Sequence, residues 1–369
     1  MTTSGIRVEL RGVGDLSLLG ETWRALEADA ETSWFQSWSW IGCWLAELEP
    51  RVRPDLLVAT DDGRIVGLAL ICRRRNTRRR VIVFRGCYLH ETGDPRLDVL
   101  TVEYNGFLVR REGSEAIVHE FLRYLGDHVR DCDEFYLSGV GAHYEKLVAR
   151  AGLGVWCRGR SPCPQFSLDE LRAGGRDLFS LLSSNTRAQL RRAMRLYEER
   201  GPLTIESAPD LDTALAYWAA LEELHQSYWT SRGEPGAFSN PFFEAMHRRL
   251  IEASLERGEV DLLRCSAGGS PIGYLYNFVH RGHVYSYQSG FHYEPDNRLK
   301  VGLVSHALAI QRYAAEGHSI YDFMAGDSQY KRSLASRQSE LVWLVLQRPL
   351  LRFRVEHVLR RLRARLSRS

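Results

Sequence analysis

HVYSYQSGF, at residues 283–291, opens the stretch of the chain that predicts the fold. Its apolar and aromatic residues predict a strand, and the loop HYEPDNRLK then leads into a helix predicted over residues 301–316. IYDFMAGD, at residues 320–327, predicts a second strand and its end, and SQYKR at 328–332 begins another helix. Polar residues therefore gather where two neighbouring strands end, which is the place where open α/β sheets bind ligands.

Part of this order occurs twice along the chain. The sequence LLVATDDGRIVGLAL at residues 56–70 matches LLRCSAGGSPIGYLY at 262–276, and each predicts two strands joined by a glycine-containing turn. The first half continues with strands predicted at 81–84 and 134–137 around an amphipathic helix over 114–130, as the second half does. Two hairpins followed by the same elements indicate an internal duplication.

The size and composition of the chain fit a soluble protein with two domains. It has 369 residues, of which 44% are hydrophobic and 26% charged, and its formal net charge is +3. Such a small net charge excludes neither nucleic acid nor anionic ligands. The N-terminus lacks the apolar run of a signal peptide, and no stretch approaches the roughly 20 apolar residues that span a bilayer. We therefore expect a cytoplasmic protein.

The cysteines indicate neither metal binding nor disulfides. There are seven, with no Cys-x-x-Cys pair and no Cys/His spacing of the zinc type. We expect reduced, mostly buried thiols and no bound metal.

The helix predicted after the loop begins with Val301-Gly302-Leu303. A helix N-terminus presents unpaired backbone N–H groups and the positive end of the helix dipole, which together favour a phosphate or pyrophosphate. Arg298 and Lys300 add positive charge just before it. An ordinary turn between a strand and a helix is the alternative.

Three side chains near the end of the second strand are candidates for chemistry. Asp322 has apolar neighbours, so its carboxylate is expected in a partly desolvated place, as a general base requires. A structural carboxylate that caps a turn or pairs with an arginine is the alternative. Tyr330 has the hydroxyl needed to protonate a leaving thiolate, although a core tyrosine with one hydrogen bond fits equally well. Lys331 has the length to reach a phosphate, and a solvated surface lysine is its alternative.

In its order of motifs the chain resembles a known group of transferases. The hairpin, YSYQSGF, the VG-initiated helix and YDFMAGDSQYKRSLA follow one another as in the acetyltransferase-like domain of the BioF2-like family. That family includes CelD-type polysaccharide-biosynthesis proteins and is related to the Fem peptidyl transferases. WFQSWSW at 34–40 resembles the family's usual start, and SSNTRAQLRRAMR at 183–195 resembles its Arg-rich helix. The resemblance spans roughly residues 30–347.

The resemblance implies an α/β fold with tandem GNAT-like domains, each a mixed central sheet with flanking helices. The N-terminal domain is expected over residues 1–165, without a donor site, because the irregular loop expected over 86–95 offers no comparable phosphate site. The C-terminal acyltransferase domain is expected over 166–347. The first domain is then expected to help shape the acceptor cleft.

The resemblance also implies roles for particular residues. In GNAT enzymes the pyrophosphate of acyl-CoA lies on backbone amides at the start of the helix after the fourth strand, here Val301-Gly302-Leu303. A tyrosine in the helix after the next strand often protonates the departing thiolate, and Tyr330 fits that position. The usual Gln/Arg-x-x-Gly-x-Gly/Ala run lacks its second glycine in the segment that begins at Arg298, which leaves the identity of the donor open.

The chemistry expected of such a site is direct transfer from an acyl-CoA, such as acetyl-CoA, to an amine. A neutral amine attacks the thioester carbonyl, a backbone N–H of the segment Tyr287-Gln288-Ser289 polarises that carbonyl, and a base removes a proton. No serine or cysteine nucleophile with a local histidine signature occurs, which favours direct transfer over an acyl-enzyme.

Two basic segments at predicted surfaces have two interpretations each. The arginines at 73–75 and 78–80 are expected at a hairpin tip around residues 76–77, where they either bind RNA, CoA phosphates or anionic lipid or form a solvated turn. The tail over 348–369 has a basic amphipathic pattern and is expected either to rest on an anionic membrane or to dock on its own domain.

A third basic segment is a predicted helix with Thr186 and Gln189 as its capping box. Arg187, Arg191 and Arg195 fall on one face of this helix. They either guide an acidic substrate or belong to a plain amphipathic surface helix.

Three functions stay open. The main prediction is an N-acyltransferase that uses acyl-CoA and acts on an amine, such as an amino sugar or a lipid- or polysaccharide-linked amine, with peripheral membrane contact through the tail. The second is an aminoacyl-tRNA-dependent, Fem-like transferase whose arginine clusters bind tRNA, although no long charged helical hairpin is present. The third is a catalytically degenerate accessory protein of polysaccharide synthesis, which the missing glycine favours.

Overall fold

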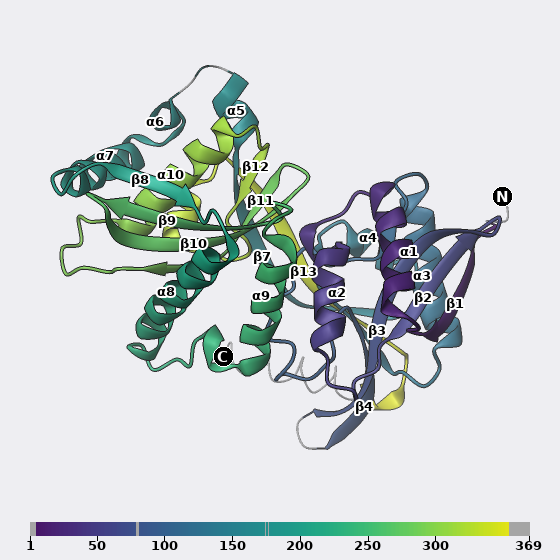
Figure 1. Ribbon diagram of the computed structural model, residues 1–369. Helices are drawn as coiled ribbons and strands as arrows, with labels where there is room; N and C mark the ends of the chain where they lie inside the picture. The colour runs from purple at the N-terminus through teal and green to yellow at the C-terminus, as the bar shows by residue number, and fades with distance from the viewer. Residues whose placement is uncertain (1–4, 79–80, 174, 176, 354–369) are drawn as a thin grey trace, which may run out of the picture. The chain divides into compact units, whose positions relative to one another are not determined.

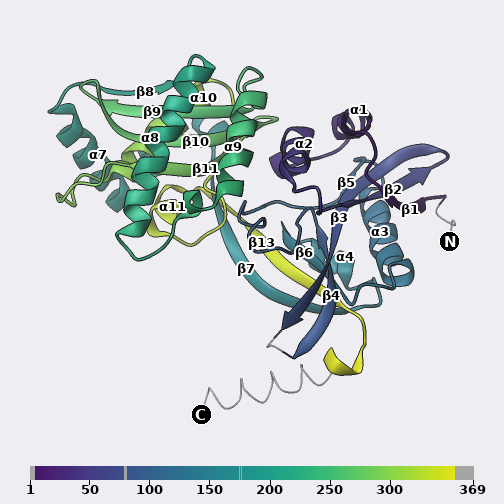
Figure 2. The same cartoon turned by 60° about the horizontal axis from the view of Figure 1, so that its bottom comes forward.

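The computed structural model describes residues 5–78, 81–173, 175 and 177–353. These residues form two compact units, which Figure 1 and Figure 2 show in two views. The first unit holds the described part of Met1–Arg160 together with residues 341–353. The second unit holds the described part of Ser161–Glu340.

The first unit is built on a mixed sheet flanked by helices. Its strands, in sheet order, are β1 (Arg7–Gly12), β2 (Asp55–Asp61), β3 (Arg64–Arg78), β4 (Ile82–Leu89), β6 (Glu134–Gly141) and the end of β13 (Arg337–Gln347), with β5 (Leu108–Val109) on β3. Its helices are α1 (Leu16–Ala28), the 3₁₀ turn Trp34–Gln36, α2 (Trp38–Glu47), α3 (Ser114–His128) and α4 (Tyr144–Val148). α3 buries Ile117 and Phe121 in the core of this unit.

The second unit repeats this plan. Its strands, in sheet order, are β8 (Leu203–Ser207), β9 (Val260–Ala267), β10 (Ser270–His280), β11 (His283–Phe291), β12 (Ile320–Asp322) and β7 (Gly154–Ser167). Its helices are α5 (Leu168–Ala173), α6 (Leu178–Leu181), α7 (Ser184–Glu198), α8 (Leu211–Thr230), the 3₁₀ turn Ala237–Ser239, α9 (Pro241–Ser254), α10 (Val301–Ala315) and α11 (Gln329–Leu334).

The order and direction of the elements agree between the two units. In each, two helices separate the first and second strands, four strands pair antiparallel, and one long helix leads to a fifth strand parallel to the fourth. The hairpin turns also agree, since Asp62 and Gly63 (φ 48° and 77°) match Gly268 and Gly269 (φ 59° and 80°), as two-residue hairpin turns require. The predicted tandem mixed sheets with flanking helices are thus confirmed.

The last strand of each repeat joins the sheet of the other repeat. β7 follows α4 in sequence, yet residues 165–167 pair with β12. β13 follows α11, yet residues 341–347 pair with β6. The units therefore divide at 160/161 and 340/341, inside these strands, whereas the sequence suggested limits at 165 and 347. Strand partners lie far apart in sequence, so no local pattern reveals such an exchange.

The described arginines of the cluster lie within strand β3 of a long hairpin. β3 continues to Arg78 and β4 runs to Leu89, so that Asn76 and Thr77 are paired strand residues and the loop expected from residue 86 begins later. The tip predicted at 76–77 is therefore wrong, because the charged segment alternates across a strand that continues past it. Residues 79 and 80 lie outside the described part of the chain.

Three of the described arginines of this cluster contact carboxylates. Three ion pairs have N–O distances of 2.6 Å and join Arg73 to Asp55, Arg74 to Asp94 and Arg78 to Glu134. Much of their charge is therefore neutralised within the unit, which weakens the interpretation of this segment as a nucleic-acid surface.

The N-cap of helix α7 is Ser183, three residues before the predicted cap. The Ser183 hydroxyl accepts a hydrogen bond from the Thr186 N–H, while Thr186 itself is buried in the first turn and Gln189 bonds Asn185. The capping box predicted at Thr186 is therefore wrong: several residues of the run SSNT are good caps, and the burial of Thr186 decides between them.

Of the predicted tail, residues 354–369 lie outside the described part of the chain, so the interpretation of this tail as a membrane contact stays a prediction. In the part of the chain that the structure describes, no helix combines the length and apolar character needed to cross a bilayer. All seven cysteines are described; none forms a disulfide, and six of them are buried, with Cys157 half-buried.

Gly290 is required where α8 crosses β11. A Cβ atom built on Gly290 would lie 2.5 Å from the Leu221 carbonyl oxygen of α8. Gly290→Ala is therefore expected to lower the free energy of unfolding by about 1–3 kcal/mol through overpacking. Urea unfolding measures the effect. Gly12→Ala is the matched control, because Gly12 also lies in a strand and has nothing within 4 Å of an added Cβ. Equal midpoints for the two variants would contradict this account.

Candidate active site in the second unit

A cavity of about 710 Å³ lies in the second unit at the C-terminal ends of α8 and β11. Its volume is in the range of small-molecule sites. Figure 2 shows α8 lying across the strands of this sheet, which it packs against. The lining comes from four segments: the last turns of α8, residues 234–237, residues 288–293, and residues 325–331.

β11 is open on one side where it reaches the cavity. β12 pairs with β11 only over residues 283–285, and β11 continues to Phe291. On the other side, Tyr276 pairs with Gln288 and Asn277 with Ser286, so Tyr287 is an extra residue that forms a β-bulge. Bulges re-aim the backbone next to active sites. Residues 288–291, beyond the stretch of β11 that pairs with β12, line the cavity.

The structure brings together four of the residues that the sequence pointed to. Gln288, Ser289, Tyr330 and Lys331 all line the cavity. Tyr287 does not line it, and instead packs in an aromatic cluster whose ring centroids lie 4.8 Å away at Phe278 and 4.9 Å away at His247.

Tyr330 lies in the first turn of α11 with 37% of its surface exposed. Its ring stacks on that of His306, with centroids 5.2 Å apart and planes 8° apart. Burial of its hydroxyl end raises the pKa of Tyr330 to about 12, so the phenol is protonated at neutral pH. Tyr330 is therefore held in place as a neutral proton donor at the cavity wall.

His306 is a site residue that the sequence did not single out. It lies on the buried face of α10, and its Nδ1 is 2.9 Å from the Tyr321 hydroxyl. Burial lowers the pKa of His306 to about 3, so its ring is neutral. The face of this neutral ring stacks against the Tyr330 ring. Its place one turn after Gly302 was visible in the sequence, but its contact with α11 was not.

The start of α10 lies beside the cavity. Val301 and Leu303 are buried, and Lys300 provides no side-chain cap, so the first N–H groups of this helix lack the partners that a capping side chain supplies. A Cβ at Gly302 would lie 3.3 Å from the Phe291 ring, and Phe291 lines the cavity. Arg298 is a short distance upstream, where its guanidinium binds the Asp296 carboxylate at 2.7 Å.

Asp322 and Lys331 hold the loop between β12 and α11. The buried Asp322 carboxylate accepts hydrogen bonds from the Gln165 side chain at 2.8 Å and the Met324 N–H at 2.7 Å, and lies 3.0 Å from His283 Nε2. Lys331 Nζ donates to the Met324 and Ala325 carbonyls at 3.2 and 2.8 Å. Asp322 does not line the cavity, and the geometry matches the structural alternative.

The corresponding place in the first unit is filled. Beyond the end of β4, Asn105 donates its backbone N–H to the Gly139 carbonyl at 3.0 Å and its side-chain N–H to the Leu89 carbonyl at 2.9 Å. His90 Nδ1 lies 3.0 Å from the Asn105 side-chain oxygen. The strand edge that stays open on β11 is therefore closed here by a segment of the chain.

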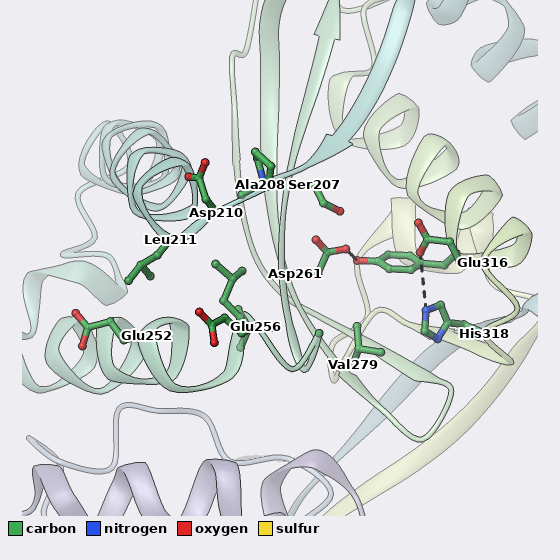
Figure 3. A pocket seen from close by; sticks show the side chains of 15 residues that line it. Ser207, Ala208, Asp210, Leu211, Glu252, Glu256, Asp261, Val279, Glu316 and His318 are labelled. Carbon is green, nitrogen blue, oxygen red and sulfur yellow. Dashed lines mark hydrogen bonds and ion pairs between the residues drawn. The ribbon is translucent and has the colours of Figure 1, made fainter.

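A second cavity, of about 540 Å³, lies elsewhere in the second unit and is acidic (Figure 3). Its carboxylates include Asp261, which accepts a hydrogen bond from the Tyr313 hydroxyl at 2.7 Å, and Glu316, which lies 3.8 Å from His318. None of the residues predicted for the site lines it. Within the described ranges, no group of three or more His, Cys, Asp or Glu side chains is arranged to hold a metal ion.

Comparisons with known proteins identify a family domain within the second unit. Residues 184–332, which hold α7 to α11 and the open end of β11, match the family model of the acetyltransferase (GNAT) domain. The match identifies residues 184–332 as an acyltransferase domain of the GNAT type. Among curated proteins, no sequence matches the chain.

Solved structures share the fold over nearly the whole chain. FemX is 10% identical with a TM-score of 0.58, covering 90% of this chain and 96% of its own. The L-PGS of Bacillus licheniformis is 12% identical (TM-score 0.54, covering 92% and 96%). A C-terminal domain assigned to a lysylphosphatidylglycerol synthetase of Agrobacterium fabrum is 10% identical (TM-score 0.53, covering 91% and 93%).

Proposed function

We propose that the second unit transfers an acyl group from an acyl-CoA, with acetyl-CoA as the simplest donor, to an amine in polysaccharide or cell-envelope biosynthesis. The observation that carries the proposal is the position of Tyr330 at a cavity lined by the end of β11, whose Phe291 ring lies beside Gly302 at the start of α10. The resemblance to BioF2-like and CelD-type proteins supports the pathway.

The start of α10 suits the phosphates of the donor. Its free N–H groups and its dipole attract a pyrophosphate, and the glycine at position 302 leaves room for close approach. The Phe291 ring lies between this helix start and the cavity, so a thioester attached to phosphates at Gly302 would have its acyl group beside β11.

The chemical step needs few groups. The amine nitrogen attacks the thioester carbonyl, a β11 backbone N–H stabilises the oxyanion, and the carbon–sulfur bond breaks as the carbon–nitrogen bond forms. Tyr330 gives its proton to the departing thiolate, and the amine loses a proton to water. Asp322 and Lys331 act by holding the loop that carries α11.

An aminoacyl-tRNA donor is the second candidate, because FemX and the lysylphosphatidylglycerol synthetase domain share this fold. That donor would need cationic side chains for its phosphates, and three arginines of the β3–β4 hairpin, Arg73, Arg74 and Arg78, are paired with carboxylates. The third candidate is a catalytically degenerate accessory protein of polysaccharide synthesis. Binding of a donor to the chain would argue against this candidate.

Calorimetry of the full chain with acetyl-CoA, longer acyl-CoAs and bulk tRNA tests the proposal. We expect saturable binding of a CoA thioester and, for tRNA, only weak binding that salt abolishes. If tRNA binds tightly while no CoA thioester binds, the aminoacyl-tRNA function replaces the one proposed. If neither binds, the accessory role is favoured.

A further inference from the structure

Aromatic side chains are unusually exposed around the cavity. Trp229 at the end of α8 is 39% exposed, Tyr293 after β11 is 57% exposed, and Tyr330 in α11 is 37% exposed, and all three line it. Large aromatic rings left in contact with solvent on several sides of one hollow mark a binding surface.

The rings are held in place by one another. The Tyr228 ring stacks on Tyr293 with centroids 4.8 Å apart and planes 30° apart, and the Arg232 guanidinium carbon lies 3.7 Å from the Tyr228 ring centroid. Phe291 meets the Tyr293 ring at 84° with centroids 6.0 Å apart. Tyr293 is therefore supported by neighbours while more than half of its surface stays open to a ligand.

Among the polar residues that line the cavity, Glu234 and Lys331 carry charge, and the tyrosines, Gln288, Ser289 and Ser328 do not. Burial raises the pKa values of Tyr293 and Tyr330 to about 12, so both phenols are neutral donors and acceptors. Gln288 and Ser328 add amide and hydroxyl groups. The ammonium of Lys331, the cation among the described lining residues, already donates to two backbone carbonyls.

We propose that the cavity binds the acceptor as an amino sugar, a pyranose ring with a free amine. One face of such a ring consists of C–H groups that pack on aromatic side chains, and its hydroxyls match neutral phenol, amide and hydroxyl partners. An amino acid or peptide acceptor would bring a carboxylate, for which a guanidinium or ammonium partner would be needed. The inference rests on the proposed function, because the sugar amine is the group that receives the acyl chain.

Binding of glucosamine without any donor tests this inference. Saturation-transfer NMR with the full chain should show glucosamine bound through its ring protons, with cyclohexylamine and lysine at least about tenfold weaker. Tyr293→Ala should weaken glucosamine binding about tenfold through the lost ring contact. Tyr293→Phe, which keeps the ring and loses only the phenol hydroxyl, should weaken it less. Tyr124→Ala, which removes a tyrosine from α3 in the first unit, is the matched control. Because Tyr293 is exposed, its variants are expected to keep the wild-type unfolding midpoint.

The outcomes separate this inference from the proposed function. Unchanged glucosamine affinity in Tyr293→Ala, or equal binding of all three amines, overturns the amino-sugar acceptor. If lysine is acylated by acetyl-CoA while glucosamine neither binds nor reacts, acyl transfer stands and the acceptor is wrong. If glucosamine binds in a Tyr293-dependent way while no CoA thioester binds, the acceptor stands and the donor is wrong.

Discussion

Tyr330→Phe is expected to lower kcat of acyl transfer by about a hundredfold or more, the range of a lost general acid. The variant keeps the ring that stacks on His306 and removes only the hydroxyl that protonates the thiolate. Binding of acyl-CoA should change little, because the donor phosphates lie at the start of α10. Thiol release followed spectrophotometrically gives kcat, and calorimetry gives the donor affinity.

The control for this variant is Tyr124→Phe, which removes a phenol far along the sequence in α3. The pH profile adds a second readout. Since burial raises the pKa of Tyr330 to about 12, its protonated form persists through the physiological range and is lost only as the pH approaches that value. Wild-type turnover in Tyr330→Phe would remove this residue from the mechanism.

Gly302→Glu is expected to weaken acyl-CoA binding by at least about a hundredfold, since it places a carboxylate where a pyrophosphate is to bind. The added side chain also meets the Phe291 ring, which lies 3.3 Å from the Cβ position. Gly302→Ala needs only a small shift of that ring, so a milder loss is expected. Calorimetry with acetyl-CoA measures both.

Gly14→Glu is the matched control for charge, because Gly14 lies in the first unit with nothing within 4 Å of an added Cβ. Wild-type affinity in Gly302→Glu, with the variant folded as judged by its unfolding midpoint, would place the donor elsewhere. Loss of affinity in both glutamate variants would point to a general effect of charge.

The duplication and the elements around the site were within reach of the sequence. The α10 helix begins at Val301 as predicted, and α11 begins at Gln329, within the segment 328–332 where a helix was predicted to start. These predictions worked because helix starts, hairpin turns and strand ends depend on neighbouring residues.

Other assignments needed contacts between distant residues. Asp322 has the sequence context of a base, but Gln165, which lies 157 positions earlier in the chain, occupies its carboxylate. His306 became a site residue only through its stack with Tyr330. Tyr287 was predicted in the site because its sequence neighbours Gln288 and Ser289 were. In the structure it is the extra residue of the β-bulge, and its side chain packs in the aromatic cluster instead.

By itself, the sequence determined the mixed α/β architecture, its repetition and the stretch that carries the site, because periodicity, turns and caps are local. Only the tertiary structure decided that β7 joins the sheet of the second unit and β13 the sheet of the first. It also decided that Asn105 bonds the edge of β4 in the first unit, and that exposed aromatic rings line the cavity with Tyr330. These features depend on pairing and packing between residues far apart in the chain, which no local pattern encodes.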